Sequence, residues 1–209
     1  IVSNKAVVNV ETSIQNQSAT PGSAIVSAYM TDREGRIVAR AKDQPLSIAV
    51  NRSATAVNNI SLVNFRNWTL DDPYLYRVVV EVRVNGKIID QQKIRYGLRQ
   101  IEIKPNGVFL NGQHVKLFGV NNHQDHAGLG SALPDYLQYY RISLLKRMGV
   151  NAYRTSHNAP TAELLDACDS LGMLVMDEQR LLNSSPEYMS QFERLIKRDR
   201  NHPSVFIWS

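Results

Sequence analysis

The chain has 209 residues, of which 43% are hydrophobic and 21% charged, which is typical of one or two globular domains. No apolar run approaches the roughly 18–20 residues that span a bilayer, so we expect no membrane partner. The net charge of +5 lies in residues 1–99 and is spread singly, whereas nucleic-acid binding needs a clustered basic patch, so no nucleic-acid partner is expected.

Residues 1–99 have the pattern of β-strands throughout. From Tyr76 to Val84 apolar and charged residues alternate with a period of two, which is typical of a half-buried strand. Asn85-Gly86 follows, the dipeptide best suited to a two-residue hairpin turn, and residues 87–96 form the return strand. A second alternating stretch covers residues 24–30. Several short strands at this spacing predict an immunoglobulin-like β-sandwich as the first domain, residues 1–99.

Strands that alternate with helices are predicted for the second domain, residues 100–209. Two turn signals at 104–107 and 111–112 indicate a small hairpin at its start. Helical spacing of apolar residues then predicts three helices. The first covers about 137–148, with Gly149 as a stop and an apolar stripe of Leu137, Tyr140, Leu144, Leu145 and Met148. The second covers about 161–171 with Gly172 as a stop, and the third runs from Ser185-Pro186 onward with Tyr188, Phe192, Leu195 and Ile196 buried.

Four short apolar runs lie around these helices, and each ends in polar or aromatic residues. The runs are residues 116–120, 150–153, 173–176 and 204–207. A parallel strand buried on both faces has a continuous apolar sequence, and a (β/α)₈ barrel collects its active-site groups at the carboxyl ends of its strands. The sequence therefore predicts strands one to four of such a barrel, interrupted after the fourth strand.

The polar groups after the first run are His123, Asp125 and His126. Three interpretations stay open for them. They form a ligand-binding rim, which we favour, or they are solvated loop residues, or they ligate a metal, although their spacing fits no established metal motif.

The ends of the other runs supply the remaining candidates. Arg154 and His157 are expected at the barrel mouth, and Arg154 needs a partner because an unpaired buried charge is costly. Asp177 or Glu178 could supply it, but adjacent strand residues point to opposite faces, so at most one of the two faces the mouth. A purely structural ion pair is the alternative. Trp208 is either a core residue or part of an aromatic floor under a sugar ring.

The single cysteine, Cys168, cannot form an internal disulfide, and we expect it to be a small buried hydrophobe rather than a nucleophile. One cysteine fits a reducing compartment without excluding a periplasm. The first residue is Ile rather than Met, which suggests that a native N-terminus has been removed, so a missing signal peptide does not indicate the compartment.

Four segments carry a family resemblance. The chain resembles glycoside hydrolase family 2 at each of them. The end of the family's immunoglobulin-like domain is matched by residues 67–76 (NWTLDDPYLY), and its strand one by residues 118–123 (FGVNNH). Strand two is matched by residues 154–157 (RTSH), and the entry to strand four by residues 198–209 (RDRNHPSVFIWS). This family includes β-galactosidases, β-glucuronidases and β-mannosidases. The pattern at 122–126 and 181–185 looks closest to bacterial β-galactosidase-like members.

The resemblance implies roles for the candidate residues. His123 and His157 would contact sugar hydroxyls, Arg154 would brace carboxylates, and Asp125 would bind hydroxyls at the far side of the ring. Carbohydrate is then the expected partner, with Asp177, Glu178 and Trp208 as further substrate-binding candidates. In the family the acid/base glutamate follows the position of Ser209 almost at once, and the nucleophilic glutamate comes much later. We therefore expect no catalytic residue within this chain. By itself the chain should be inactive.

One departure concerns magnesium. Some β-galactosidases of the family place a Glu and a His after strand three as ligands, and the matching positions here are Leu182 and Ser184. We therefore expect no magnesium site and no other cofactor.

The resemblance implies a piece of a retaining exo-β-glycosidase that acts on β-galactosides, with β-glucuronidase or β-mannosidase as the alternative. A non-catalytic carbohydrate-binding or adhesive module is the rival from another class. The unpaired edges of half a barrel predict that the chain is a homo-oligomer or otherwise self-associates. The resemblance favours a periplasmic or secreted location over a cytoplasmic one.

Overall fold

The computed structural model describes residues 4–181 and 183–209. Its internal contacts divide the chain into two compact units. The first contains the described residues up to Arg66 together with Tyr76–Tyr96, and the second contains Asn67–Leu75 and Gly97–Ser209.

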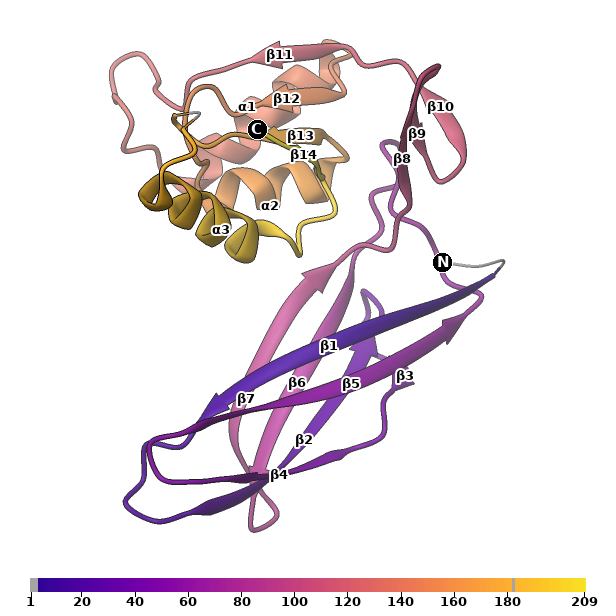
Figure 1. The fold of residues 1–209 in the computed structure, drawn as a ribbon. Coiled ribbons are helices and arrows are strands. Elements are labelled where there is room, and N and C mark those ends of the chain that lie inside the picture. Colours follow the sequence, from indigo (N-terminus) through magenta and orange to yellow (C-terminus); the bar gives the residue numbers. More distant parts are fainter. Residues whose placement is uncertain (1–3, 182) are drawn as a thin grey trace. The chain divides into compact units, whose positions relative to one another are not determined.

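The first unit is a sandwich of two antiparallel sheets (Figure 1). One sheet pairs two long strands, β1 (Lys5–Gln15) and β5 (Ser53–Val63). In the other sheet two short strands pair with one edge of a set of three long strands. Its members are β2 (Gly22–Thr31), β3 (Ile37–Arg40), β4 (Gln44–Ile48), β6 (Tyr76–Val84) and β7 (Lys87–Tyr96). The predicted sandwich is confirmed.

Alternation along the strands places the apolar residues between the two sheets. Ala24, Val26, Ala28 and Met30 of β2 are all buried, as the period of two predicted. Asn85 and Gly86 both have positive φ and close the β6–β7 hairpin. One polar residue is also buried between the sheets: Asn58 is a fully buried amide whose Nδ2 donates to the carbonyls of Val26 and Lys42. No sequence pattern predicted it.

A segment from the middle of the chain, Asn67–Leu75, packs with the second unit. Trp68 is fully buried there, and its Nε1 donates to the carbonyl of Asp169 at 2.8 Å. It shares a cluster with Leu110 and Leu174. A three-stranded antiparallel sheet lies beside it, formed by β8 (Ile101–Lys104), β9 (Gly107–Leu110) and β10 (Gln113–Val115), so the predicted hairpin is present with one additional strand.

The second unit is built around a parallel sheet with strands in sequence order. These are β11 (Gly119–Asn121), β12 (Ala152–Arg154), β13 (Leu174–Asp177) and β14 (Val205–Trp208). Each predicted apolar run became a strand, with the strand placed one to three residues later than the run. All three pairings are parallel, so the four carboxyl ends lie along one edge of the sheet.

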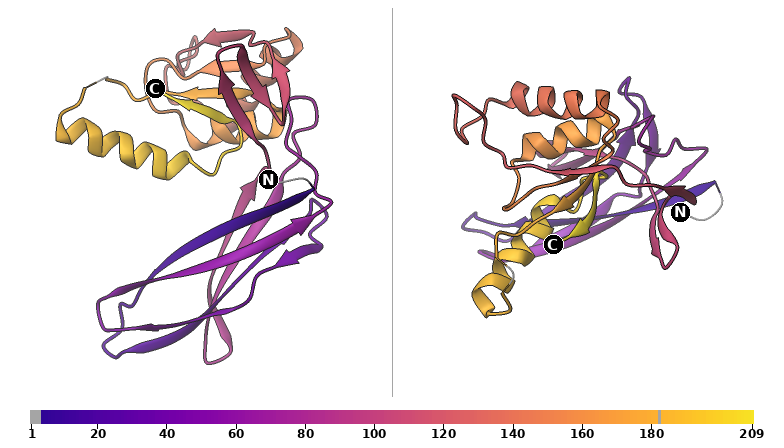
Figure 2. Two further views of the ribbon diagram at one scale, coloured as in Figure 1. Left: turned by 45° about the vertical axis from the view of Figure 1, so that its right-hand side comes forward. Right: turned by 90° about the horizontal axis from the view of Figure 1, so that it is seen from above.

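Three helices connect these strands: α1 (Asp135–Arg147), α2 (Ala162–Leu171) and α3 (Pro186–Asp199). Figure 2 shows α1 and α2 side by side on one face of the sheet. Thr161 caps α2 by accepting a hydrogen bond from the Leu164 backbone N–H, and Gly172 ends it in the left-handed conformation. The predicted order of strands and helices, the first half of a (β/α)₈ barrel, is confirmed.

The buried faces of the helices differ in part from the predicted ones. In α1, Tyr140 and Met148 were expected in the apolar stripe but are 51% and 77% exposed, whereas Gln138 and Ile142 are buried. In α3 only Leu195 of the predicted set is fully buried. The periodicity predicted each helix correctly. Which face of the helix is buried depends on the elements that pack against it. Cys168 is fully buried as expected, and burial raises the pKa of its thiol.

None of the helices in the described part of the chain is long and apolar enough to cross a membrane.

Candidate functional site

Arg154 and Glu178 meet at the carboxyl edge of the parallel sheet. Arg154 is the last residue of β12, and Glu178 directly follows β13. The Arg154 Nη2 atom donates to Glu178 Oε1 at 2.8 Å. Arg154 pairs with Met176 of β13, and residues two apart along a strand point to the same face. Glu178 therefore points to the face of Arg154, whereas Asp177 points to the other, which settles the partner that the sequence left undecided.

His157 completes this group. Its Nδ1 lies 3.2 Å from the same Oε1 atom of Glu178, so one carboxylate oxygen serves two nitrogens. The His123 ring, from the loop after β11, lies edge-on to the His157 ring with 5.4 Å between the centroids. We call Arg154, Glu178, His157 and His123 the strand-end cluster.

Glu178 is held from several directions. Its side chain is 10% exposed, and its backbone N–H donates to Thr155 Oγ1 at 3.0 Å. Its second carboxylate oxygen, Oε2, is buried and has no hydrogen-bond partner among the described residues. A carboxylate fixed in this way orients the Arg154 and His157 side chains. Its Oε2 atom stays available as an acceptor, because no described residue donates to it.

Arg141 of α1 positions the loop that carries His123. Its guanidinium donates to the backbone carbonyls of His123 at 2.6 Å and of Gln124 at 3.0 Å. These bonds tie the first strand end to the helix layer. The sequence did not single out Arg141 or Thr155, because an arginine inside a helix and a threonine beside a strand end carry no specific signal.

Three predicted site residues lie outside the cluster. Asp125 is exposed in the loop after β11 and forms no hydrogen bond or ion pair with the other described residues. Asp177 is fully buried and its carboxyl faces Asp199 of α3. Trp208 packs against the apolar cluster under the helices that includes Val205. Trp208 is only partly buried, so both interpretations of it stay predictions.

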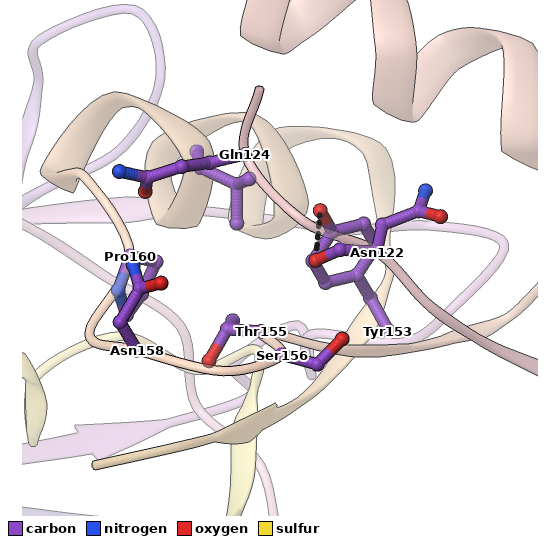
Figure 3. Close-up of a pocket in the computed structure, with 8 residues that line it drawn as sticks. Asn122, Gln124, Tyr153, Thr155, Ser156, Asn158 and Pro160 are labelled. Atoms are coloured by element: carbon purple, nitrogen blue, oxygen red, sulfur yellow. Dashed lines mark hydrogen bonds between the residues drawn. The ribbon is translucent and has the colours of Figure 1, made fainter. Parts of the chain in front are cut away.

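A small polar pocket lies next to the cluster, on the helix side of the strand ends. Figure 3 shows Asn122 and Tyr153 on one side of it, with Asn158 opposite and Thr155 and Ser156 below. The Tyr153 hydroxyl donates to the Asn122 carbonyl across 3.5 Å. The pocket has room for about one water molecule, and none of the predicted site residues lines it, so it is not a site for a sugar.

His123, Asp125 and His126 are not among the described side chains that lie close enough together to share an ion. Within residues 4–181 and 183–209, the grouping of ligating side chains close enough to share an ion is Asp166, Asp169 and His202. There Asp169 already accepts from His202 Nδ1 at 2.6 Å and from the Ser204 backbone N–H at 3.0 Å. These bonds use both carboxylate oxygens internally.

The two positions matching magnesium ligands offer no suitable donor set either. Ser184 is an exposed residue with a hydroxyl in place of a carboxylate or imidazole, and Leu182 lies outside the described residues. Magnesium prefers carboxylate oxygens and water, so this chain does not fit a site at those positions.

The sandwich has a cleft of its own between β1 and the β6–β7 pair. Val80, Val82 and Ile89 are among the residues that line it, and none of the lining residues is aromatic. Binding of a sugar ring needs an aromatic face or a set of oriented polar side chains. The cleft has no aromatic face, but polar side chains that include Glu11, Asp90 and Gln92 line it, so it does not exclude the rival interpretation of the chain as a carbohydrate-binding module.

The strand-end cluster is suited to binding hydroxyl-rich molecules. Two imidazoles, a guanidinium and an anchored carboxylate offer hydrogen-bond donors and acceptors at fixed positions. It has one carboxylate, with Asp177 on the opposite face of β13. The cluster as described can orient a substrate, but it does not contain the facing carboxyl pair that glycoside hydrolysis uses.

Two family models match the chain along almost its whole length. "Glycosyl hydrolases family 2, TIM barrel domain" matches residues 101–209, and "Glycosyl hydrolases family 2" matches residues 1–99. Among curated proteins, a β-galactosidase of Bacteroides ovatus is 34% identical over 98% of this chain and 26% of its own length. A β-galactosidase of Thermoanaerobacterium thermosulfurigenes is 30% identical over 100% of this chain and 30% of its own length.

Solved structures agree. A family 2 glycosyl hydrolase from Bacteroides cellulosilyticus has a TM-score of 0.90 and 36% identity, covering 98% of this chain and 29% of that one. A β-glucuronidase of the same family has a TM-score of 0.93 and 28% identity, covering 100% of this chain and 23% of that one. The chain thus spans roughly a quarter to a third of the length of the relatives described here.

Proposed function

The chain belongs to glycosyl hydrolases family 2, and on that premise we propose that it forms part of a retaining exo-β-glycosidase acting on terminal β-galactosides. Residues 1–99 would be its sandwich domain and residues 100–209 the first half of its barrel. The strand-end cluster would bind the sugar in the −1 position, with His123 and His157 on its hydroxyls.

The observation that carries this proposal is that Arg154 and His157 share Glu178 and that the His123 ring packs against His157. These residues come from three different strand ends and two are separated by more than 50 positions in the sequence. Side chains brought together at the carboxyl edge of a parallel sheet are the usual way in which a barrel builds its site. Asp125, exposed in the neighbouring loop, would join the site when a sugar is bound.

The balance of charge favours a neutral sugar over a uronic acid. Glu178 compensates the charge of Arg154, so this pair offers no net positive charge to a sugar carboxylate. β-Glucuronidase remains the second candidate, because curated and structural relatives with that name match the chain as well.

The reaction would proceed by double displacement. A retaining enzyme uses two carboxyl groups about 5–5.5 Å apart, one as nucleophile and one as acid/base. Glu178 is committed to Arg154 and His157, so we propose that both catalytic glutamates come from elsewhere in the whole protein and that residues 1–209 alone do not cleave glycosides.

The test uses the whole protein with two aryl substrates, a β-galactoside and a β-glucuronide, and measures kcat/KM for each. We expect hydrolysis of the galactoside with retention of the anomeric configuration, read by NMR of the first product. Cleavage of the glucuronide alone would replace galactoside by the second candidate. Cleavage of neither substrate, with no binding of either sugar, would reject the proposal.

A further inference from the structure

Asp177 and Asp199 form a buried pair of carboxyls that the proposed function does not use. Asp177 is the last residue of β13, and Asp199 is the last residue of α3. Both side chains are shielded from solvent, with exposed fractions of 0% and 1%. The two lie within hydrogen-bonding reach of each other, although two ionised carboxylates at such a distance would repel each other strongly.

The surroundings determine which of the two carries the charge. Asp199 accepts from Nε and Nη2 of Arg198, both at 2.6 Å, so it has a cationic partner on each oxygen. Neither oxygen of Asp177 receives a hydrogen bond from a donor among the described residues. A buried carboxylate without donors is unfavourable, whereas a neutral carboxylic acid would donate to Asp199 and remove the deficit.

We propose that Asp177 is a protonated positioning residue that donates a hydrogen bond to Asp199. This bond ties the carboxyl end of β13 to α3 and thereby fixes Glu178 in the strand-end cluster. Glu178 is the next residue in the chain, and it holds both Arg154 and His157. The backbone of Asp177 is fixed as well, because its carbonyl accepts from the Ser209 N–H at 2.8 Å. The link to sugar binding rests on the proposed function, but the proton itself does not.

Titration of the pair agrees with this arrangement. Burial, followed by the contact with Asp199, raises the pKa of Asp177 to about 8. The charged groups that face it are Arg198 and Asp199 of α3 and His202 after α3, and Arg198 and His202 both lower its pKa. Burial lowers the pKa of His202, but its hydrogen bond to Asp169 of α2 and neighbouring carboxylates raise it overall. His202 is therefore the second group whose titration must be separated from that of Asp177.

The experiment compares three variants of the whole protein with the unmodified one. Asp177→Asn keeps the shape and a donor to Asp199 but cannot ionise, Asp177→Ala removes the donor, and Asp43→Asn changes an exposed aspartate of the sandwich as the matched control. The affinity for a non-hydrolysable β-thiogalactoside is measured from pH 5 to pH 10. Infrared difference spectra between the unmodified protein and Asp177→Asn identify the protonated carboxyl.

We expect the affinity of the unmodified protein and of Asp43→Asn to fall as the pH rises through about 8, since the second negative charge then separates the pair. Asp177→Asn should retain its affinity over that range, and Asp177→Ala should bind weakly at every pH. The infrared spectrum at pH 6 should contain a protonated-acid band that disappears in Asp177→Asn.

Two outcomes would overturn the proposal. One is the same alkaline loss in Asp177→Asn, which would assign the titration to His202 or another group. The other is the absence of a protonated-acid band at pH 6. If no form binds the thiogalactoside, the proposed function fails while the band still decides the state of Asp177. Thermal unfolding provides a further measure, because a raised carboxyl pKa makes stability fall as the pH rises from about 4 to about 8, and Asp177→Asn should flatten that slope.

Discussion

A single oxygen atom organises the candidate site at the scale of residues. Glu178 Oε1 accepts from both Arg154 and His157, so the guanidinium and the imidazole are oriented by one carboxylate rather than by separate partners. The backbone N–H of Glu178 is bound by Thr155, a neighbour of Arg154 in the sequence. Such sharing means that displacement of Glu178 moves two side chains of the strand-end cluster at once.

Replacement of Glu178 by Gln should therefore impair the site more than the loss of one charge suggests. The amide retains the shape, but it leaves Arg154 without its anion and gives His157 a weaker acceptor. We expect kcat/KM for the aryl galactoside to fall on the order of 100-fold, the usual effect of small misplacements in an active site.

The matched control for this substitution is Glu193→Gln on the exposed side of α3, where the ion pair with Lys197 is open to solvent. Activity should be unchanged in the control. A Glu178→Gln enzyme with full activity would show that the ion pair has only a structural role.

At the scale of elements, the close approach between α2 and the Asn67–Leu75 segment determines how the second unit is assembled. Gly172 ends α2 with φ of +72°, and a Cβ atom there would overlap the carbonyl of Leu70. Lys146 of α1 donates to the Leu70 carbonyl at 3.1 Å and to the Gly172 carbonyl at 2.9 Å. Two helices and one loop thus meet at a position where only glycine fits.

We expect Gly172→Ala to destabilise the protein by about 4 kcal/mol, because it combines left-handed strain with a steric overlap that only backbone movement relieves. Gly149→Ala is the matched control, since Gly149 follows α1 with φ of +87° and has open space around its Cβ position. The control should cost about 1–2 kcal/mol, the strain alone. Chemical denaturation measures both, and equal losses would exclude a role for the contact with Leu70.

At the scale of the whole molecule, the parallel sheet leaves two edges in the described part of the chain. β11 pairs with β12 only, and β14 pairs with β13 only. Unpaired apolar edge strands bind other chains through their free backbone groups. Only residues outside the described part of the chain, or another molecule, could therefore pair with these edges.

We expect residues 1–209, expressed alone, to self-associate through these edges. Light scattering over a range of concentrations should give a mass above that of the 23.6 kDa chain. Proline in place of Asn121, in β11, should reduce the association if that edge is used. The backbone N–H of the next residue, Asn122, donates to Arg154 of β12, so that of Asn121 faces the unpaired side, where proline removes a donor and is tolerated. A mass equal to one chain at all concentrations would contradict the prediction.

Local signals in the sequence were sufficient for several of the elements. Asn85-Gly86 fixed a hairpin, Thr161 and Gly172 bounded a helix, and the apolar runs became the four parallel strands. Each of these features depends on backbone conformation or on burial along one element. The pairing of Arg154 with a carboxylate at the end of β13 also followed, because parallel strands align their carboxyl ends.

The sequence by itself determined the order of the elements, the family and most of the residues in the strand-end cluster, since these depend on local periodicity and short motifs. Tertiary structure alone decided that Glu178 enters the cluster while Asp177 faces Asp199, and that Asn67–Leu75 packs with the second unit. Those outcomes depend on which groups from distant parts of the chain share a buried space. The physical reason is that burial and pairing depend on both residues of a contact. The sequence around one residue does not specify which distant residue it will meet.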